Sequence, residues 1–230
     1  MMEYRLVRSR RKTIAITFDE NARLVVKAPY WLDDERIRGF VEAKGEWIKA
    51  TQTRLLAVRQ KNFQGRPKLE TGDRLPYLGG EKVLTVVRDA RARVKVVKAG
   101  DRIIMWVPYE ADYELRRMHL ERWYRSEAAY IFDKRAAKYA RIIGVTYHQI
   151  HIKDQKSRWG SCSGKGNLNF NWRLVMAPGE VLDYVVIHEL CHLVHMNHSP
   201  EFWELVERSC PSYAKQKRWL KANGETLYII

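Results

Sequence analysis

The stretch His188-Glu189-Leu190-Cys191-His192, followed by His198-Ser199-Pro200-Glu201-Phe202, contains the residues around which the chain is organised. The apolar run before it is typical of a helix that packs against a core. On an α-helix, positions four apart lie about 40° apart around the axis and about 6 Å apart along it. His188 and His192 therefore present two imidazoles to one point, and Glu189 projects beside them. Zinc accepts such ligands and leaves one position open for water, from which Glu189 is placed to take a proton.

A catalytic zinc site needs a third protein ligand, and His198 is the first candidate. Ser199 suits the N-cap of a second helix, and Pro200 suits its first position. We therefore expect the first helix to end near 196–197, with His198 at the corner between the two helices. Glu204, one turn into the second helix, is the rival ligand. We interpret His195 as facing solvent or supporting a ligand.

Composition limits the class of protein. The chain has 230 residues, 46% of them apolar, and a formal net charge of +15. A balance this basic favours anionic partners, so we expect non-specific binding of polyanions or nucleic acid, although a merely solvated basic surface would have the same composition. Three cysteines are too few for a disulfide framework. The N-terminus lacks an apolar signal segment, and no apolar run is long enough for a membrane span, so we expect a cytoplasmic protein without membrane contact.

The chain divides by pattern into a strand-rich part and a helical part. Three short strands at the front suit a meander covered by one long helix over 33–60, and a second set of strands follows it. A long helix over 112–143 comes next, with Gly144 as its C-terminal cap. We expect an α+β protein with a β-rich region over 1–110 and a catalytic domain over 111–230. The predicted strands are 4–9, 13–18, 24–28, 75–78, 83–87, 94–97, 103–107, 147–153 and 167–171.

Four segments of the sequence resemble one known family. They are Arg158-Trp159-Gly160-Ser161-Cys162, Asn169 through Pro178, Asp183 through Leu190, and His192 through Trp203. These segments resemble the YgjP-like (DUF45) metal-dependent hydrolases, which are related to the M48-type and SprT-like zinc metallopeptidases. The resemblance extends weakly to the front of the chain.

The resemblance implies a zincin-like fold with one zinc ion per chain. His188, His192 and His198 are then the metal ligands, and Glu189 is the general base. The resemblance also implies that Asn167–Asn171 is an edge strand over the cleft. Such a strand pairs an extended peptide through its free N–H and C=O groups.

Three functions compete at this point. The first is a zinc peptidase that cleaves polypeptides, and the second is a metal-dependent pyrophosphohydrolase that acts on nucleoside triphosphates. The third is a nucleic-acid-binding module with a structural zinc, which leaves Glu189 without a task. Candidates for binding substrate or stabilising the transition state are Arg158, Asn169, Tyr184, His195 and Tyr213.

Overall fold

The computed structural model describes residues 3–19, 21–64, 66–156 and 158–230. The chain forms two compact units, Met1–Gly65 and Arg66–Ile230. Each unit has its own cluster of buried apolar side chains. None of the described helices combines the length and the apolar composition needed to cross a membrane. The cysteines at positions 162, 191 and 210 are free.

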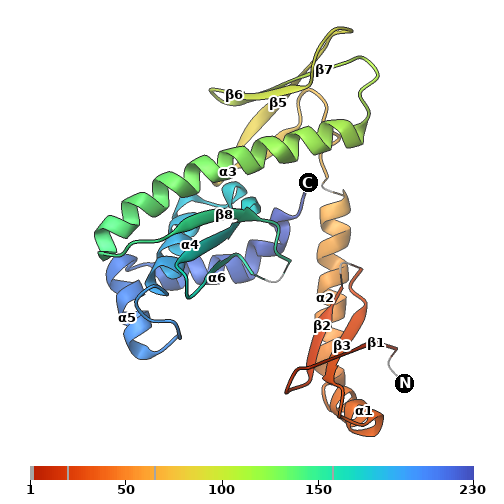
Figure 1. Ribbon diagram of the computed structural model, residues 1–230. Helices are drawn as coiled ribbons and strands as arrows, with labels where there is room; N and C mark the ends of the chain where they lie inside the picture. Colours follow the sequence, from red (N-terminus) through yellow and green to blue (C-terminus); the bar gives the residue numbers. More distant parts are fainter. Residues whose placement is uncertain (1–2, 20, 65, 157) are drawn as a thin grey trace. The chain divides into compact units, whose positions relative to one another are not determined.

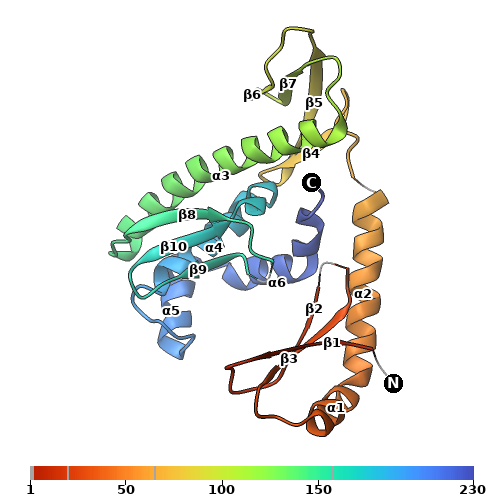
Figure 2. The same ribbon diagram turned by 45° about the vertical axis from the view of Figure 1, so that its right-hand side comes forward.

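The first unit contains a three-stranded sheet formed by β1 (Arg5–Ser9), β2 (Ala15–Phe18) and β3 (Leu24–Pro29). The predicted strands are confirmed, but the predicted meander is wrong. β3 lies between β1 and β2, and it pairs with β1 in parallel (Figure 2). β3 is almost entirely buried, whereas β1 and β2 are only partly so. The most buried strand therefore takes the central position in the sheet.

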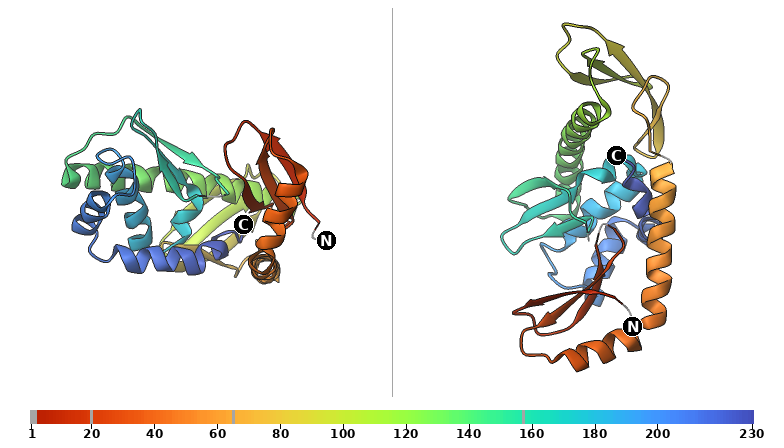
Figure 3. Two further views of the ribbon diagram at one scale, coloured as in Figure 1. Left: turned by 90° about the horizontal axis from the view of Figure 1, so that it is seen from below. Right: turned by 90° about the vertical axis from the view of Figure 1, so that its right-hand side faces the viewer.

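Two helices, not the predicted single one, cover this sheet. α1 (Asp34–Ala43) and α2 (Gly45–Gln64) are separated at Lys44, whose φ of −103° and ψ of 11° end the first helix. Figure 3 shows the change of direction between them. The break allows Ile37 from α1 and Ile48 from α2 to reach the same small core.

The second unit begins with the sheet formed by β4 (Arg74–Tyr77), β5 (Gly80–Arg88), β6 (Lys95–Ala99) and β7 (Arg102–Val107), in the order β4-β5-β7-β6. α3 (Tyr113–Ile143) follows, and Figure 1 shows it running from this sheet to the third sheet. Asp112 caps its first turn by accepting from Leu115 N–H at 2.8 Å. Gly144 ends it in the left-handed region, at φ 81°, where a residue without Cβ is favoured. The predicted helix and its cap are confirmed.

A third sheet contains β8 (Gln149–Lys153), β9 (Gly160–Cys162) and β10 (Asn167–Asn171), in the order β8-β10-β9. The predicted strand at Asn167–Asn171 exists, but its predicted position at an edge is wrong. β10 pairs with β8 in parallel and with β9 antiparallel. Two of its side chains, Leu168 and Phe170, are fully buried, and Phe170 stacks on Phe132 of α3 at 4.3 Å between ring centroids. Because β10 pairs with a strand on each side, it takes the centre of the sheet, and β9 forms an edge.

The rest of the second unit is helical. A 3-10 helix over Trp172–Met176 leads into α4 (Gly179–Cys191), which packs against α3. Arg135 of α3 and Asp183 of α4 form an ion pair at 2.5 Å that joins the two helices. α5 (Pro200–Ser209) and α6 (Tyr213–Asn223) complete the fold, with a last 3-10 turn over Gly224–Leu227.

The first unit ends at Gly65 and the second begins at Arg66, whereas the change from strands to helices suggests a boundary near residue 110. The strands β4 to β7 belong with the helices because they share one core. Leu75, Leu84 and Ile103 are fully buried in the same apolar cluster as residues of α3 and α4. Tyr124 of α3 also donates to the carbonyl of Pro76 at 2.8 Å. The secondary structure changes from strands to helices near residue 110, but one cluster of buried apolar side chains includes residues on both sides of this point.

We expect residues 66–230 to fold without the first unit, because each cluster of buried apolar residues lies within one unit. A fragment of this range should unfold cooperatively in urea, with a midpoint close to that of the same unit in the full chain. Circular dichroism of both proteins measures this directly. An insoluble fragment, or one without a cooperative transition, would show that the second unit needs residues 1–65.

Candidate metal centre

α4 places His188 and His192 on one face, as predicted. The helix ends at Cys191, and His192 is its C-cap in the right-handed helical conformation, at φ −66° and ψ −16°. The four-residue spacing therefore keeps its helical geometry. The predicted helix end near 196–197 is wrong, because the backbone tightens after Cys191 into short turns. One of these turns brings the carbonyl of His195 to 3.0 Å from Nδ1 of His192, which orients that ring.

His198 closes the cluster from the corner between α4 and α5. One ring nitrogen from each of His188, His192 and His198 lies within 4.8 Å of the other two. Nε2 of His188 and Nε2 of His198 are 3.2 Å apart. Two nitrogens that bind one tetrahedral zinc at about 2.0–2.1 Å lie about 3.3 Å from each other. The spacing of the donor atoms therefore fits a single zinc-sized cation.

The protonation of these rings also suits a metal. Burial, together with the neighbouring His192 and His198, lowers the pKa of His188 to about 3. Burial also lowers the pKa of His192. Both rings are thus neutral at physiological pH, which is the form that binds a metal. Nδ1 of His188 is buried without a hydrogen-bond partner among the described residues, so packing against aromatic rings, and not a hydrogen bond at this nitrogen, holds the ring.

Aromatic side chains of α5 support the cluster. Phe202 is fully buried, and its ring centroid lies 5.0, 4.5 and 4.9 Å from those of His188, His192 and His198. Trp203 stacks on His198 at 5.6 Å. α5 therefore packs its first turn against the three imidazoles. Ser199 is the N-cap of α5 and Pro200 its first residue, as predicted, although the Ser199 hydroxyl donates to Glu201 and not to the helix backbone.

Glu189 is buried beside the histidines, on the side that faces β9. Burial raises the pKa of its carboxyl group to about 8. The positive charge of Arg158 and a hydrogen bond from the backbone N–H of Cys162 oppose this rise by favouring the carboxylate. A divalent cation at the three histidines would act in the same direction. The position thus offers a carboxyl group that can gain or release a proton near neutral pH.

Gly160 of β9 is in contact with that carboxyl group. A Cβ atom built on Gly160 would lie 2.5 Å from Oε1 of Glu189 and 2.7 Å from its Cγ. Both distances are shorter than any real contact of a methyl carbon. The strand can lie this close to α4 only because residue 160 has no side chain. Glycine is therefore a requirement of the site, and not of a turn.

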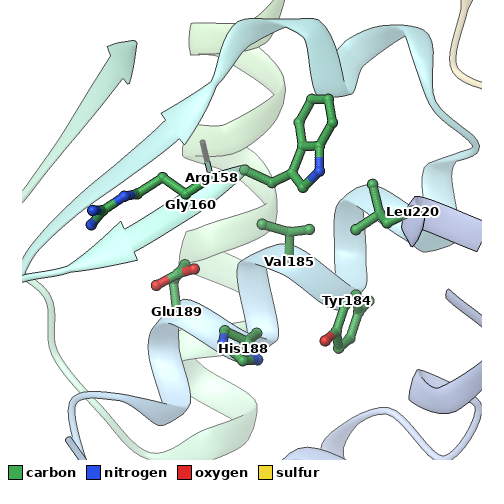
Figure 4. Close-up of a pocket in the computed structure, with 8 residues that line it drawn as sticks. Arg158, Gly160, Tyr184, Val185, His188, Glu189 and Leu220 are labelled. Carbon is green, nitrogen blue, oxygen red and sulfur yellow. The ribbon is translucent and has the colours of Figure 1, made fainter. Parts of the chain in front are cut away.

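A pocket opens next to Glu189, with a volume of about 220 Å³. Figure 4 shows Glu189 and His188 projecting from α4, with Arg158 and Gly160 across from them. Apolar groups contributed by α4, by α6 and by the segment before β9 form the rest of the wall. The lining residues are Arg158, Trp159, Gly160, Tyr184, Val185, His188, Glu189 and Leu220.

Three of the five predicted substrate-binding candidates lie around this pocket. Arg158 and Tyr184 line it. Tyr213 stacks on Tyr184 at 6.4 Å and on Trp203 at 5.4 Å, so it supports the aromatic wall. Burial raises the pKa of Tyr184 to about 12. Its phenol therefore stays protonated at neutral pH and can donate a hydrogen bond.

The other predicted residues lie elsewhere. Asn169 is on the central strand β10, and its amide donates to the hydroxyl of Ser161 at 3.1 Å within the sheet. His195 contributes its backbone carbonyl to His192, and so supports a candidate ligand. Glu204, the rival ligand, is exposed and is not part of the cluster of donor atoms.

Sequence reasoning missed Gly160, the Cys162 amide, Phe202 and Lys217. The Lys217 ammonium lies 4.1 Å from the centroid of the Trp203 ring, and its charge contributes to the lowered pKa of His188. In the sequence, nothing distinguishes this lysine from the other basic residues of its helix, so its position near the histidines could not be predicted. Gly160 lies in a segment that the family resemblance highlighted, but its role depends on the approach of a helix distant in sequence.

Comparison with known proteins decides the family. Residues 12–223 match the family described as YgjP-like, metallopeptidase domain. The chain belongs to this family. The predicted resemblance is confirmed, and the chain is a metal-dependent hydrolase of the metallopeptidase type, for which the family implies a divalent metal.

The crystal structure of the metallopeptidase zymogen of Pyrococcus abyssi abylysin is similar at 26% sequence identity, with a TM-score of 0.36, over 40% of this chain and 93% of that chain. No curated protein matches the sequence.

We expect His198→Ala to weaken zinc binding by more than about 100-fold, because even groups that merely orient a metal ligand contribute about 10–100-fold. Glu204→Ala, an exposed position on α5, is the matched control and should leave the zinc affinity unchanged. Isothermal titration calorimetry of the metal-free proteins with zinc measures the affinity of both variants. Equal affinity for His198→Ala and wild type, with a loss in Glu204→Ala, would make Glu204 the ligand.

We expect Gly160→Ala to lower hydrolytic turnover by roughly 100-fold, since a displacement of about 1 Å in a reacting group costs that much. The new methyl group would push the Glu189 carboxyl away, while the three histidines stay in place. Zinc affinity should therefore be unchanged. Gly164→Ala, where an added Cβ meets nothing within 4 Å, is the control and should retain full activity. A fully active Gly160→Ala enzyme would contradict the requirement for glycine.

Proposed function

We propose that this protein is a zinc-dependent peptidase, in which His188, His192 and His198 hold one zinc ion and Glu189 is the general base. The observation that carries the proposal is the buried carboxyl group of Glu189, held between the three imidazoles and the edge strand β9. A structural zinc site would have no use for such a group, because its ligands close the coordination shell. The third function suggested by the sequence, a nucleic-acid module with a structural zinc, is therefore disfavoured.

In this proposal, zinc would polarise the scissile carbonyl and lower the pKa of a water molecule. Glu189 accepts a proton from the attacking water at a carboxylate oxygen. The water oxygen bonds to the carbonyl carbon, and the C–N bond then breaks. Glu189 returns the proton to the nitrogen of the leaving amine. The Cys162 N–H holds the carboxylate in place during both transfers.

Two side chains are available to stabilise the negative charge that develops on the carbonyl oxygen. Arg158 brings a permanent positive charge to the pocket, and Tyr184 brings a phenol that stays protonated. Donors already in place where charge develops contribute strongly to catalysis. We propose Tyr184 for this role, because its ring lies against His188 at 5.8 Å, whereas the charge of Arg158 already favours the ionised form of Glu189.

The edge strand for a peptide substrate is β9 in this proposal, in place of the central β10. Asn171 N–H donates to the Trp159 carbonyl at 2.8 Å, and Ser163 N–H donates to the Asn167 carbonyl at 3.0 Å. Backbone groups of alternate residues in an antiparallel pair point to the same side. Gly160 and Cys162 therefore point their N–H and C=O groups away from β10. Cys162 gives its N–H to Glu189, so Gly160 is free to pair with an extended peptide beside the histidines.

The second candidate is hydrolysis of nucleoside triphosphates. It is favoured by two basic side chains, Arg158 near Glu189 and Lys217 near His188, since a polyphosphate needs cations close to the reacting centre. The histidine cluster speaks against it, because magnesium-dependent phosphohydrolases use oxygen ligands. The apolar side of the pocket, with Trp159, Val185 and Leu220, also suits the side chain of a peptide better than a phosphate.

We expect Glu189→Gln to keep its zinc and to lose peptide hydrolysis by at least about 100-fold, because the amide retains the shape of the carboxyl group and cannot accept a proton. Glu180→Gln, an exposed glutamate on the same helix, is the matched control and should be fully active. Zinc-loaded wild type and both variants should be assayed on unfolded casein and on nucleoside triphosphates. Triphosphate hydrolysis that depends on Glu189, without any peptide cleavage, would replace the peptidase by the second candidate.

A further inference from the structure

The first unit displays two adjacent aromatic side chains in solvent. Tyr30 and Trp31 lie between β3 and α1, and they are 65% and 72% exposed. Trp31 has the largest exposed fraction of the large apolar side chains described. The next residue, Leu32, is buried in the small core of the unit. Burial alone would have turned these rings inward, so their exposure indicates a contact surface.

Arg8 holds the segment that carries the two rings. Its Nη1 donates to the carbonyls of Pro29 and Tyr30 at 3.1 Å and to that of Leu32 at 2.6 Å. Its Nη2 pairs with Asp34 at 2.5 Å. One guanidinium thus joins four acceptors on either side of Trp31. The backbone beneath the rings is fixed before any partner arrives, which lowers the entropy lost on binding.

A basic segment follows β1 at the end of the sheet where Tyr30 and Trp31 follow β3. β1 and β3 are parallel, and Ser9 pairs with Pro29 at their last position. The carboxyl ends of parallel neighbours lie together, so the segment Arg10-Arg11-Lys12 begins where Tyr30 and Trp31 begin. Arg10 and Lys12 are exposed, whereas Arg11 donates to the carbonyl of Thr13.

The first unit as a whole has a positive net charge. Residues 1–65 contain 14 Lys and Arg and 8 Asp and Glu, which gives a formal net charge of +6. Two of the acidic side chains near the rings are already engaged. Asp34 is paired with Arg8, and Asp33 caps α1 and lies 3.4 Å from Arg36.

We propose that this surface, Tyr30, Trp31, Arg10 and Lys12, binds single-stranded nucleic acid. Bases stack on the two rings, and the phosphates between them lie against the two cations. Stacking needs the faces of bases, which a duplex does not offer, and any base can provide it. An anionic membrane is the less suitable partner, because an interfacial site needs a broad apolar face and Leu32 points into the core. The proposal does not depend on the function of the metal centre.

The test is fluorescence anisotropy of the full chain with a labelled single-stranded oligonucleotide of mixed sequence at low salt. Stacking contributes about 1–3 kcal/mol per base, so Trp31→Ala should weaken binding by about 5- to 150-fold. Trp31→Phe should recover most of the affinity, because it keeps a ring. Tyr130→Ala is the matched control, since Tyr130 on α3 is also 65% exposed and lies 5.7 Å from the Lys134 ammonium. It should bind like wild type.

The cations are tested by the salt dependence. Each phosphate contact on a single strand contributes about 0.7 to the slope of log K against log salt. The double variant Arg10→Gln, Lys12→Gln should therefore lower the slope by about 1.4. Circular dichroism of every variant checks that the unit remains folded.

Three results would overturn the proposal. The first is no binding at low salt, and the second is equal affinity of wild type and a folded Trp31→Ala. The third is Trp31-dependent binding to phosphatidylserine vesicles without binding to the oligonucleotide, which would make the surface a membrane contact.

Discussion

The buried carboxyl group of Glu189 is the constraint on which the candidate site depends. A charge inside a protein is costly unless donors or cations surround it. Here the Cys162 N–H and the charge of Arg158 favour the ionised group, and both come from the segment that enters and forms β9. For β9 to bring them near enough, the strand must lie against α4, and glycine at position 160 is what makes that approach possible. The ionisation of Glu189 therefore depends on the position of β9 at the edge of the third sheet.

The three histidines depend in turn on how α4 and α5 meet. α4 is buried along most of its length, and the side chains that it contributes to the pocket come from its middle and its C-terminal part, between Tyr184 and Glu189. The chain then turns back within a few residues and starts α5, whose Phe202 lies against all three imidazoles. The ring leaves little room for the imidazoles to move away from their common point. A family assignment, a cluster of nitrogens spaced for one cation and a supported carboxyl group agree with one another.

The two units use charged side chains differently. In the second unit, Arg135 pairs with Asp183 to fix α3 to α4, so its charge serves the packing. In the first unit, Arg8 is placed under a segment that faces solvent, and the side chains it holds up are aromatic. A guanidinium that organises three carbonyls beneath exposed rings does little for a core. Some of the basic side chains of this chain thus stabilise the fold, and others remain exposed at the surface.

The sequence by itself determined the features that depend on local geometry. Helical spacing placed His188 and His192 on one face, the Ser199-Pro200 pair located the start of α5, and Gly144 marked the end of α3. The corner position of His198 followed from those elements. The strands other than β9 were also predicted, because alternation and turn residues act over a few positions. β9 was interpreted as part of a polar turn.

Only the tertiary structure decided which strands are neighbours and which residues meet across them. β3 and β10 are central because each pairs with a strand on either side, and this pairing joins segments that are distant in the sequence. The helix break at Lys44 and the unit boundary after Gly65 also depend on tertiary packing. Each follows from which apolar side chains are buried in the same core, and this cannot be seen in the local sequence. Gly160 is the clearest example. Its lack of a side chain acquires meaning only when α4, far along the chain, comes into contact with it.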